Sequence, residues 1–123
     1  MKPIVFRGKQ TGTGEWIYGY PVELSGHIYL YYCVYDAFLS RDEVIPETLC
    51  ACTGQLGEGD TPLYEHDIVF DTMSSEFGVV EWAENDAMFV VRYQDYFEAF
   101  DVIDSRDLRV LGNIFDDSSL LDQ

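Results

Sequence analysis

Carboxylates are the side chains best able to do chemistry in this chain, because 23 of its 123 residues are Asp or Glu. Glycosidase-type hydrolysis needs two carboxyl groups at a fixed separation, one of them with a raised pKa. Glu81, Glu84 and Asp86 lie close together in sequence, but such groupings arise by chance in so acidic a chain. The carboxylate pattern therefore predicts no catalytic residue.

Three cysteines and two histidines are the other candidate metal ligands. Cys50 and Cys52 share one face of an expected strand. A tetrahedral zinc site needs two more soft ligands, and His27 and His66 have no paired spacing that would supply them. For the same reason His66 is not predicted to be a metal ligand or a general base. We expect these two cysteines and Cys33 to be packed thiols, with no metal and no cofactor bound.

Motifs that hold phosphates, calcium or a serine nucleophile are missing from the sequence. Residues 55–60 contain two glycines but lack the alternating oxygen ligands and closing Glu of a calcium loop. The serine pairs Ser74-Ser75 and Ser118-Ser119 lie outside any G-x-S-x-G turn, and no P-loop or G-x-G-x-x-G is present. The prediction is therefore a protein without catalytic, cofactor-binding or metal-binding residues, and not an enzyme.

The net charge of −16 limits the partners that the chain can bind. Residues 61–123 contain 15 acidic and three basic residues, a net charge of −12, whereas residues 1–60 carry −4. Nucleic-acid binding depends on Lys and Arg that displace counterions from phosphates. We therefore expect neither direct nucleic-acid binding nor docking on an anionic membrane. A basic protein partner is compatible with this surface, and so is a charge that serves solubility alone.

The N-terminal residues bear on cellular location. Residues 1–7 (M-K-P-I-V-F-R) lack the apolar core of a secretory signal. No stretch of the chain approaches the roughly 18–20 apolar residues that cross a membrane. The sequence therefore predicts a cytoplasmic protein with reduced thiols.

The composition predicts an all-β or β-dominated fold in a single domain over residues 1–123. Aromatic residues, which favour strands, are abundant: 9 Tyr, 8 Phe and 2 Trp. Most Gly and Pro residues separate apolar runs, as in β proteins. In the N-terminal part, residues 1–53, strands are expected over residues 3–9, 15–24, 27–35 and 48–52. A hairpin turn is expected at Ser25-Gly26 and a polar connection over residues 36–47.

The second half predicts a more compact arrangement. Strands are expected over residues 67–73, 78–82, 87–93, 97–103 and 108–112, followed by a helical turn at 116–121. Five short strands with short connections favour a small SH3-like barrel or meander over residues 61–115, because closure removes exposed edges. The predicted core comprises Val69, Val79, Trp82, Phe89, Val91, Phe100, Val102 and Val110.

A run of tyrosines marks the expected strand over residues 27–35. Strand geometry places Tyr29, Tyr31 and Tyr35 on one face and Tyr32 on the other. Platforms that stack single-stranded nucleic acid add basic residues to such aromatics, and none lies between His27 and Ser40. The stripe is either a packed inner face or a patch that binds a protein.

Four pieces of the chain, taken in order, resemble the YopX family of small phage and prophage proteins. The pieces are Phe6-Arg7; Pro46-Glu47-Thr48 with Thr53-Gly54; L-Y-E-H-D-I-V at 63–69 with G-V-V-E-W at 78–82; and V-L-G-N-I-F at 110–115 with Leu120-Leu121. The resemblance covers nearly the whole chain. It implies a YopX-like β fold, a phage or prophage setting and no established biochemical activity.

The third piece departs from the family pattern at one position. The family usually has Gly where this chain has His66, and Gly there would serve a positive backbone φ. Asp67 is expected to cap the same turn by accepting backbone N–H bonds. Gly112-Asn113, in the fourth piece, is expected to form a tight turn or bulge.

These observations lead to three functional hypotheses. The first is an uncharacterised phage or prophage accessory protein that acts through protein–protein contacts, with a protein partner or as a homo-oligomer. The second is an acidic DNA mimic that inhibits a host nucleic-acid-binding protein, with Asp101, Asp104 and Asp107 among its charges. The third, and the least supported by the residues, is a carboxylate- or metal-dependent enzyme.

Overall fold

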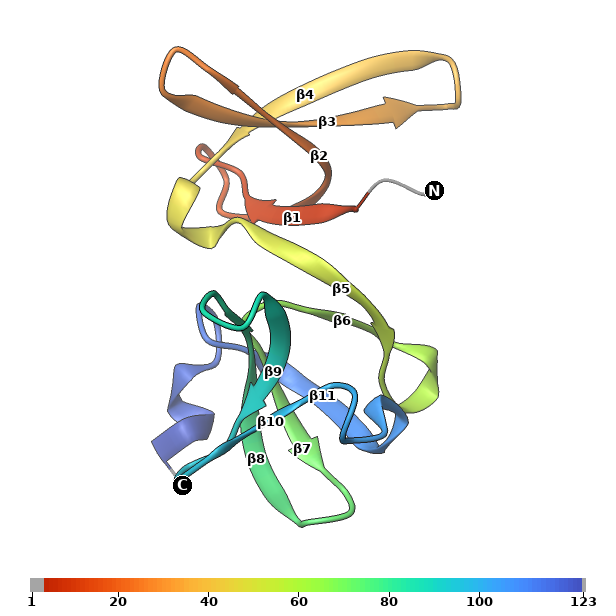
Figure 1. Ribbon diagram of the computed structural model, residues 1–123. Coiled ribbons are helices and arrows are strands. Elements are labelled where there is room, and N and C mark those ends of the chain that lie inside the picture. The colour runs from red at the N-terminus through yellow and green to blue at the C-terminus, as the bar shows by residue number, and fades with distance from the viewer. Residues whose placement is uncertain (1–3, 123) are drawn as a thin grey trace. The chain divides into compact units, whose positions relative to one another are not determined.

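The computed structural model describes residues 4–122, and the chain forms two compact units, Met1–Cys52 and Thr53–Gln123 (Figure 1). Within the described residues, the regular elements are eleven strands and four short 3-10 helices. The predicted β-dominated fold is thus confirmed. None of the helices in this part of the chain is long and apolar enough to cross a membrane.

The first unit is an antiparallel meander. Its strands are β1 (Phe6–Lys9), β2 (Trp16–Leu24), β3 (His27–Val34), β4 (Phe38–Val44) and the start of β5 (Cys50–Leu56), with the 3-10 helix η1 (Pro46–Thr48) before β5. They pair in the order β4-β3-β2-β1, and β1 also pairs with the first residues of β5. An isolated bridge between Gln10 and Val44 ties the end of β4 to the residue after β1. Leu30, Val44 and Cys50 are buried inside this curled sheet.

The hairpin turn predicted between β2 and β3 is confirmed. Leu24 pairs with His27, so Ser25 and Gly26 form a two-residue loop. Both have positive φ, 53° and 82°, which is the geometry that matches the twist of the flanking strands.

Strand β4 corrects the prediction of a polar connection over residues 36–47. Its sequence, F-L-S-R-D-E-V, carries three charged residues and so reads as a loop. An edge strand tolerates charges, because one of its sides has no strand neighbour and stays wet. Seven residues of β4 pair with β3, from Ile28 with Val44 to Val34 with Phe38.

The second unit is built on a five-stranded antiparallel sheet. Its elements are η2 (Glu58–Asp60), β6 (Pro62–Tyr64), β7 (Asp67–Asp71), β8 (Glu76–Ala83), β9 (Met88–Arg92), β10 (Phe97–Ala99), η3 (Ser105–Asp107), β11 (Leu108–Asn113) and η4 (Ser118–Asp122). The sheet order is β10-β9-β8-β7-β11. The five predicted strands are therefore present, although β10 is shorter than expected and β6 was missed. The helical turn predicted near the C-terminus corresponds to η4.

The SH3-like barrel predicted for residues 61–115 is not confirmed. Closure would require the two edge strands of the sheet, β10 and β11, to pair with each other, and they do not. β10 has only three residues and is followed by a turn rather than by more strand. The sheet therefore stays open.

Buried apolar residues lie on both faces of this sheet. The main cluster comprises Leu63, Val69, Val80, Val91, Tyr93 and Leu108, and Ile68, Val79 and Val90 are buried on the opposite face. Of the predicted core residues, Val69, Val79 and Val91 are buried, and Phe89, Phe100 and Val110 are partly buried. The prediction was wrong for Trp82, which lies near the end of β8 and is 44% exposed, and for Val102, which follows β10 in a turn and is 69% exposed.

Candidate interaction surface

Aromatic and aliphatic side chains line one face of β2 and β3. Tyr20 pairs with Tyr31, and Val22 pairs with Tyr29, so these four side chains project from the same side of the sheet. Tyr18, two residues before Tyr20, projects from that side as well. We call these five residues the tyrosine face. Tyr18 and Tyr20 are 50% and 45% exposed, and Tyr29 and Tyr31 are half-buried.

Arg41 of β4 lies over the tyrosine face because it pairs with Tyr31 across the two strands. The centre of its guanidinium is 4.6 Å from the ring centroid of Tyr29 and 5.8 Å from that of Tyr31. Its Nη1 also donates a hydrogen bond to the Tyr31 hydroxyl at 2.9 Å. A cation over an aromatic face in this way is worth roughly 0.5–1 kcal/mol at an exposed site.

The contacts of Arg41 differ from those of the arginines in the second unit. Those three pair with carboxylates, as Arg92 with Glu81, Arg106 with Asp60 and Arg109 with Glu58. Within residues 4–122, no carboxylate lies at ion-pair distance from Arg41. Tyrosines thus position this exposed cation, whose charge no carboxylate of the described residues neutralises.

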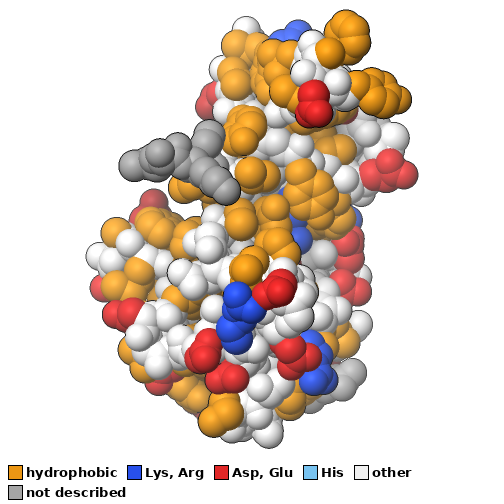
Figure 2. Space-filling view, turned by 90° about the vertical axis from the view of Figure 1, so that its right-hand side faces the viewer, with side chains coloured by type: hydrophobic (Ala, Val, Ile, Leu, Met, Phe, Trp, Pro, Cys, Tyr) orange, Lys and Arg blue, Asp and Glu red, His pale blue; other side chains and the backbone are white. Residues whose placement is uncertain are grey.

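Two more cations extend the same side of the sheet. Arg7 and Lys9 of β1 pair with Tyr18 and Trp16 of β2. The Arg7 guanidinium is 4.8 Å from the Trp16 ring centroid, and the Lys9 ammonium is 5.5 Å from it. Figure 2 shows the hydrophobic side chains that gather over the unit formed by β1–β4.

The other two tyrosines of the run have different outcomes. The prediction that Tyr32 points to the opposite face is confirmed, since its hydroxyl donates to Asp42 on that side. The prediction that Tyr35 shares the face of Tyr29 and Tyr31 is wrong. Tyr35 follows the end of β3, has a positive φ of 54° and is 90% exposed.

The turn at His66 joins the third and fourth of the pieces on which the family resemblance rests. His66 has φ of 69°, so the positive φ expected there is confirmed. Asp67 is buried and accepts a hydrogen bond from the Tyr64 N–H at 2.8 Å, as predicted for a turn cap. The His66 N–H donates to the Val80 carbonyl, and the His66 carbonyl accepts from the Ile114 N–H.

The bulge expected at Gly112 is also present, between Val110 and Gly112 on β11. A Cβ at Gly112 would lie 2.2 Å from the Asp117 carboxylate, which accepts the Asn113 N–H.

The model of the YopX family (YopX protein) matches residues 6–122. The chain belongs to the YopX family. A search of curated proteins finds no match.

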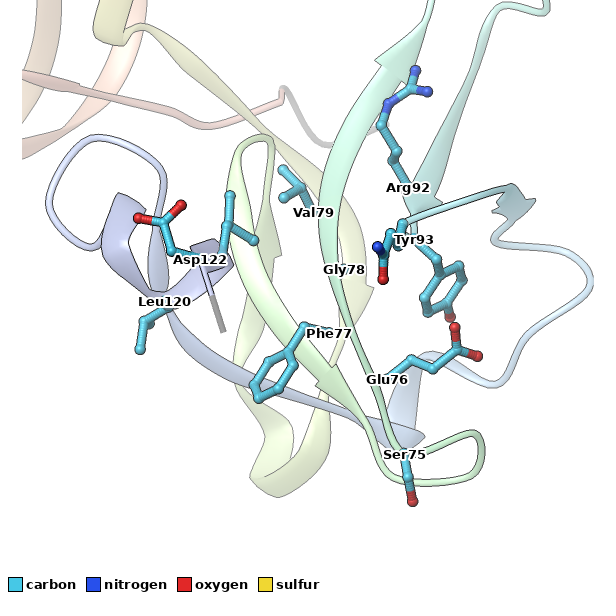
Figure 3. Close-up of a pocket in the computed structure, with 11 residues that line it drawn as sticks. Ser75, Glu76, Phe77, Gly78, Val79, Arg92, Tyr93, Leu120 and Asp122 are labelled. Atoms are coloured by element: carbon cyan, nitrogen blue, oxygen red, sulfur yellow. The ribbon is translucent and has the colours of Figure 1, made fainter.

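The second unit of this YopX-family chain has a groove of about 600 Å³ (Figure 3). Residues of β8 and β9 and the C-terminal 3-10 helix line it, among them Glu76, Phe77, Arg92, Tyr93 and Leu120. The Tyr93 hydroxyl donates to Asp71 Oδ2 at 2.6 Å, and the Tyr96 hydroxyl donates to Glu76 Oε1 at 2.6 Å. The two tyrosine rings stack with centroids 4.8 Å apart.

The protonation states of this cluster are fixed near neutral pH. Burial acts to raise the pKa of Asp71, but hydrogen bonds from Tyr93, Met73 and Ser74 outweigh it and the pKa is lowered. Burial, and then the hydrogen bond to Asp71, raises the pKa of Tyr93 well above its usual range. The hydrogen bond to Glu76 raises the pKa of Tyr96 to about 12. General acid–base catalysis is most effective when a pKa lies near the working pH. The pKa values of Asp71 and Tyr93 are shifted away from neutral pH, so their hydrogen bond stabilises the fold.

The other candidate catalytic residues, Glu81, Glu84, Asp86 and His27, do not form one cluster. Glu81 pairs with Arg92, and His27 Nδ1 lies 2.6 Å from Glu43 Oε2. Glu84 and Asp86 are exposed in the loop between β8 and β9. Within residues 4–122, no group of three or more His, Cys, Asp or Glu side chains could hold a metal ion.

The packing predicted for the three cysteines holds for only part of the set. Cys50 is buried, and its thiol donates to the Thr48 carbonyl at 3.1 Å. Cys52 is half-buried. Cys33 is exposed near the end of β3, so the prediction was wrong there.

Proposed function

We propose that this YopX-family protein is a phage or prophage accessory protein without catalytic activity, and that it binds another protein through the tyrosine face. The observation that carries the proposal is Arg41, held over Tyr29 and Tyr31 without a carboxylate partner among residues 4–122. Tyrosine and arginine are enriched among the residues that contribute most to protein interfaces. Exposed Tyr18 and Tyr20 beside them extend the surface.

The chemistry of this surface defines its partner. A chain with net charge −16 repels acidic proteins at long range. The tyrosine face is less acidic, since the exposed Arg41 and the half-buried Lys9 lie on its side of the sheet and Glu43 is the carboxylate paired with Tyr29 there. It fits a protein segment that places a carboxylate at Arg41 and apolar side chains on the tyrosine rings. Complementary charge would set the orientation of that segment, and the apolar contact would supply most of the affinity.

The test is affinity capture from bacterial lysate followed by measurement of the Kd for the captured protein. We expect Tyr20→Ala/Tyr31→Ala to weaken binding about 30-fold or more, as for interface residues worth at least about 2 kcal/mol. Arg41→Ala is expected to weaken it as well, with Arg41→Lys intermediate because lysine lacks the planar stacking surface. Tyr96→Ala is the matched control, because Tyr96 is 43% exposed against 45% for Tyr20 but belongs to the second unit. Equal affinity for the wild type and the Tyr20→Ala/Tyr31→Ala variant would refute the proposal.

The charge of the second unit favours a second candidate function, a DNA mimic. Residues 53–123 contain 17 acidic and three basic residues, a net charge of −14. Asp101 and Asp104 are exposed and Asp107 is half-buried. Such a surface could occupy the DNA site of a basic host protein.

Asp104 also caps η3 by accepting the Arg106 N–H at 3.0 Å, so the charge test leaves it intact. If the mimic hypothesis is correct, Asp101→Asn/Asp107→Asn weakens capture of a basic nucleic-acid-binding protein, and high salt releases that protein from the wild type. The tyrosine-face variant would bind it normally. Salt-resistant capture that is unaffected by the two Asn substitutions would exclude the mimic.

A further inference from the structure

The tip of the β3–β4 hairpin exposes three large apolar side chains. Tyr35 is 90% exposed, Phe38 68% and Leu39 70%. We call these three residues the hairpin tip; they lie at and just after the loop that joins β3 to β4 in Figure 1. Single exposed apolar residues are common on soluble proteins. Here three lie at one hairpin end, and because Phe38 and Leu39 are consecutive in β4 they present apolar surface on both of its faces.

The backbone of this loop is unfavourable for the residues that it carries. Tyr35 and Asp36 both have positive φ, 54° and 56°. The β2–β3 turn meets a similar demand with Gly26, which adopts positive φ without steric cost. In the β3–β4 loop, a tyrosine and an aspartate occupy the two positions instead. Positive φ at non-glycine residues also occurs in other turns, at Ser25, Ser75 and Ala87, but Tyr35 is the bulkiest of the turn residues with this geometry and is 90% exposed.

The second unit has a small groove of complementary character. It is lined by Thr53, Gln55, Met88, Phe89, Ala99, Phe100 and Asp101, and its volume is about 230 Å³. Sites for small molecules usually measure about 300–1,000 Å³, so this groove suits one or two side chains. Met88, which is 40% exposed, and the partly buried Phe89 and Phe100 make its walls apolar.

The hairpin tip and the groove also differ in the charge around them. Beyond the hairpin tip, β4 continues to Arg41, which has no carboxylate partner within residues 4–122. The groove carries the exposed Asp101 and belongs to the unit with net charge −14. The unit that bears the hairpin tip has four basic and six acidic residues, a net charge of only −2. Contact between the hairpin unit of one copy and the acidic unit of another therefore meets less repulsion than contact between two acidic units.

We propose that the hairpin tip of one copy inserts into the groove of a second copy, so that the protein self-associates through two different patches. Tyr35 or Phe38 fills the groove beside Met88 and Phe100, and Arg41 approaches Asp101. The hairpin tip and the groove share no residue with the tyrosine face, although Arg41 takes part in both proposed contacts. The variants that test self-association leave Arg41 and the tyrosine face unchanged, so its failure is distinguishable from failure of the proposed binding of another protein.

Sedimentation of the purified full chain from about 1 to about 100 µM tests the proposal, over a range that covers weak to moderate self-association. We expect concentration-dependent association by the wild type. Tyr35→Ser/Phe38→Ser/Leu39→Ser and, separately, Met88→Glu should each raise the midpoint concentration at least ten-fold. The matched control is Met73→Ser, which removes a side chain that is 77% exposed in the loop between β7 and β8.

Mixing the two defective variants gives the decisive result. One contributes an intact groove and the other an intact hairpin tip, so a 1:1 mixture should associate although each variant alone stays monomeric. Circular dichroism of each variant checks that it is folded. A monomeric wild type, a hairpin-tip variant that associates normally, or a mixture of folded variants that stays monomeric would each overturn the proposal. Partner capture by the tyrosine face is measured separately, so failure of one idea does not conceal the other.

Discussion

Replacing Gly19 with alanine is expected to lower the unfolding free energy of the first unit by about 3 kcal/mol, at the upper end for an overpacked site. A Cβ at this position would lie 2.3 Å from the Tyr31 carbonyl oxygen and 3.0 Å from its carbonyl carbon. Both atoms belong to the backbone of the neighbouring strand, so no rotamer change relieves the clash. The pairing of β2 with β3 must open instead, and with it the alignment of Tyr20 with Tyr31.

Urea denaturation followed by circular dichroism measures this effect. Gly12→Ala is the matched control, because a Cβ there meets no atom within 4 Å and the backbone does not have positive φ. That change should alter stability by no more than about 0.5 kcal/mol. If the Gly19→Ala molecules that remain folded also bind the partner more weakly, the spacing of β2 and β3 determines the shape of the tyrosine face. Equal stability of the two variants would contradict the packing described for Gly19.

Local chemistry made part of the structure predictable from the sequence. Ser25-Gly26 specifies its turn through backbone φ alone, and both residues are adjacent in the chain. The cap at Asp67 was predictable for the same reason, because its carboxylate accepts a nearby backbone N–H, whereas the positive φ at His66 followed from the Gly that the family usually has there. Alternating apolar residues likewise identify most strands of both units.

The parts that sequence reasoning missed depend on pairing between distant residues. Arg41 reaches Tyr29 and Tyr31 only because β4 pairs with β3, and the charges of β4 concealed that strand. Arg7 and Lys9 reach Trp16 through the pairing of β1 with β2. The aromatic half of the candidate surface was therefore visible in the sequence, and its cationic half was not.

Exposure was the other quantity that the sequence could not fix. Trp82 and Val102 are as apolar as the buried residues of the second unit, yet Trp82 lies near the end of β8 and Val102 lies in the turn beyond β10. The alternation of apolar residues along a strand shows which face a residue occupies, but not how far along the strand other residues pack over that face. The same uncertainty explains Tyr35 and Cys33, which continue the alternation of β3 but lie at or beyond its exposed end.

The second large effect is expected from Tyr93→Phe, which should lower the unfolding free energy of the second unit by about 2 kcal/mol at pH 7, the range for a hydrogen bond to a charged group. The substitution keeps the ring, its burial and its stacking on Tyr96, and removes only the donor to the buried Asp71 carboxylate. Tyr96→Phe is the matched control. It removes the corresponding hydrogen bond to Glu76 at an exposed site, where water replaces the lost partner, so we expect a much smaller loss.

The pH dependence of the Tyr93→Phe effect separates this hydrogen bond from packing. The pKa of Tyr93 is raised on folding, so its stabilisation is complete below the unfolded value of about 10 and is lost as the pH rises above it. The pKa of Asp71 is lowered, so its stabilisation is complete above the unfolded value of about 4 and is lost as the pH falls below it. The difference between wild type and Tyr93→Phe should therefore be constant from about pH 5 to 9 and shrink at both ends. A difference that stays constant to pH 11 and to pH 3 would mean that the Tyr93 hydroxyl contributes through packing alone.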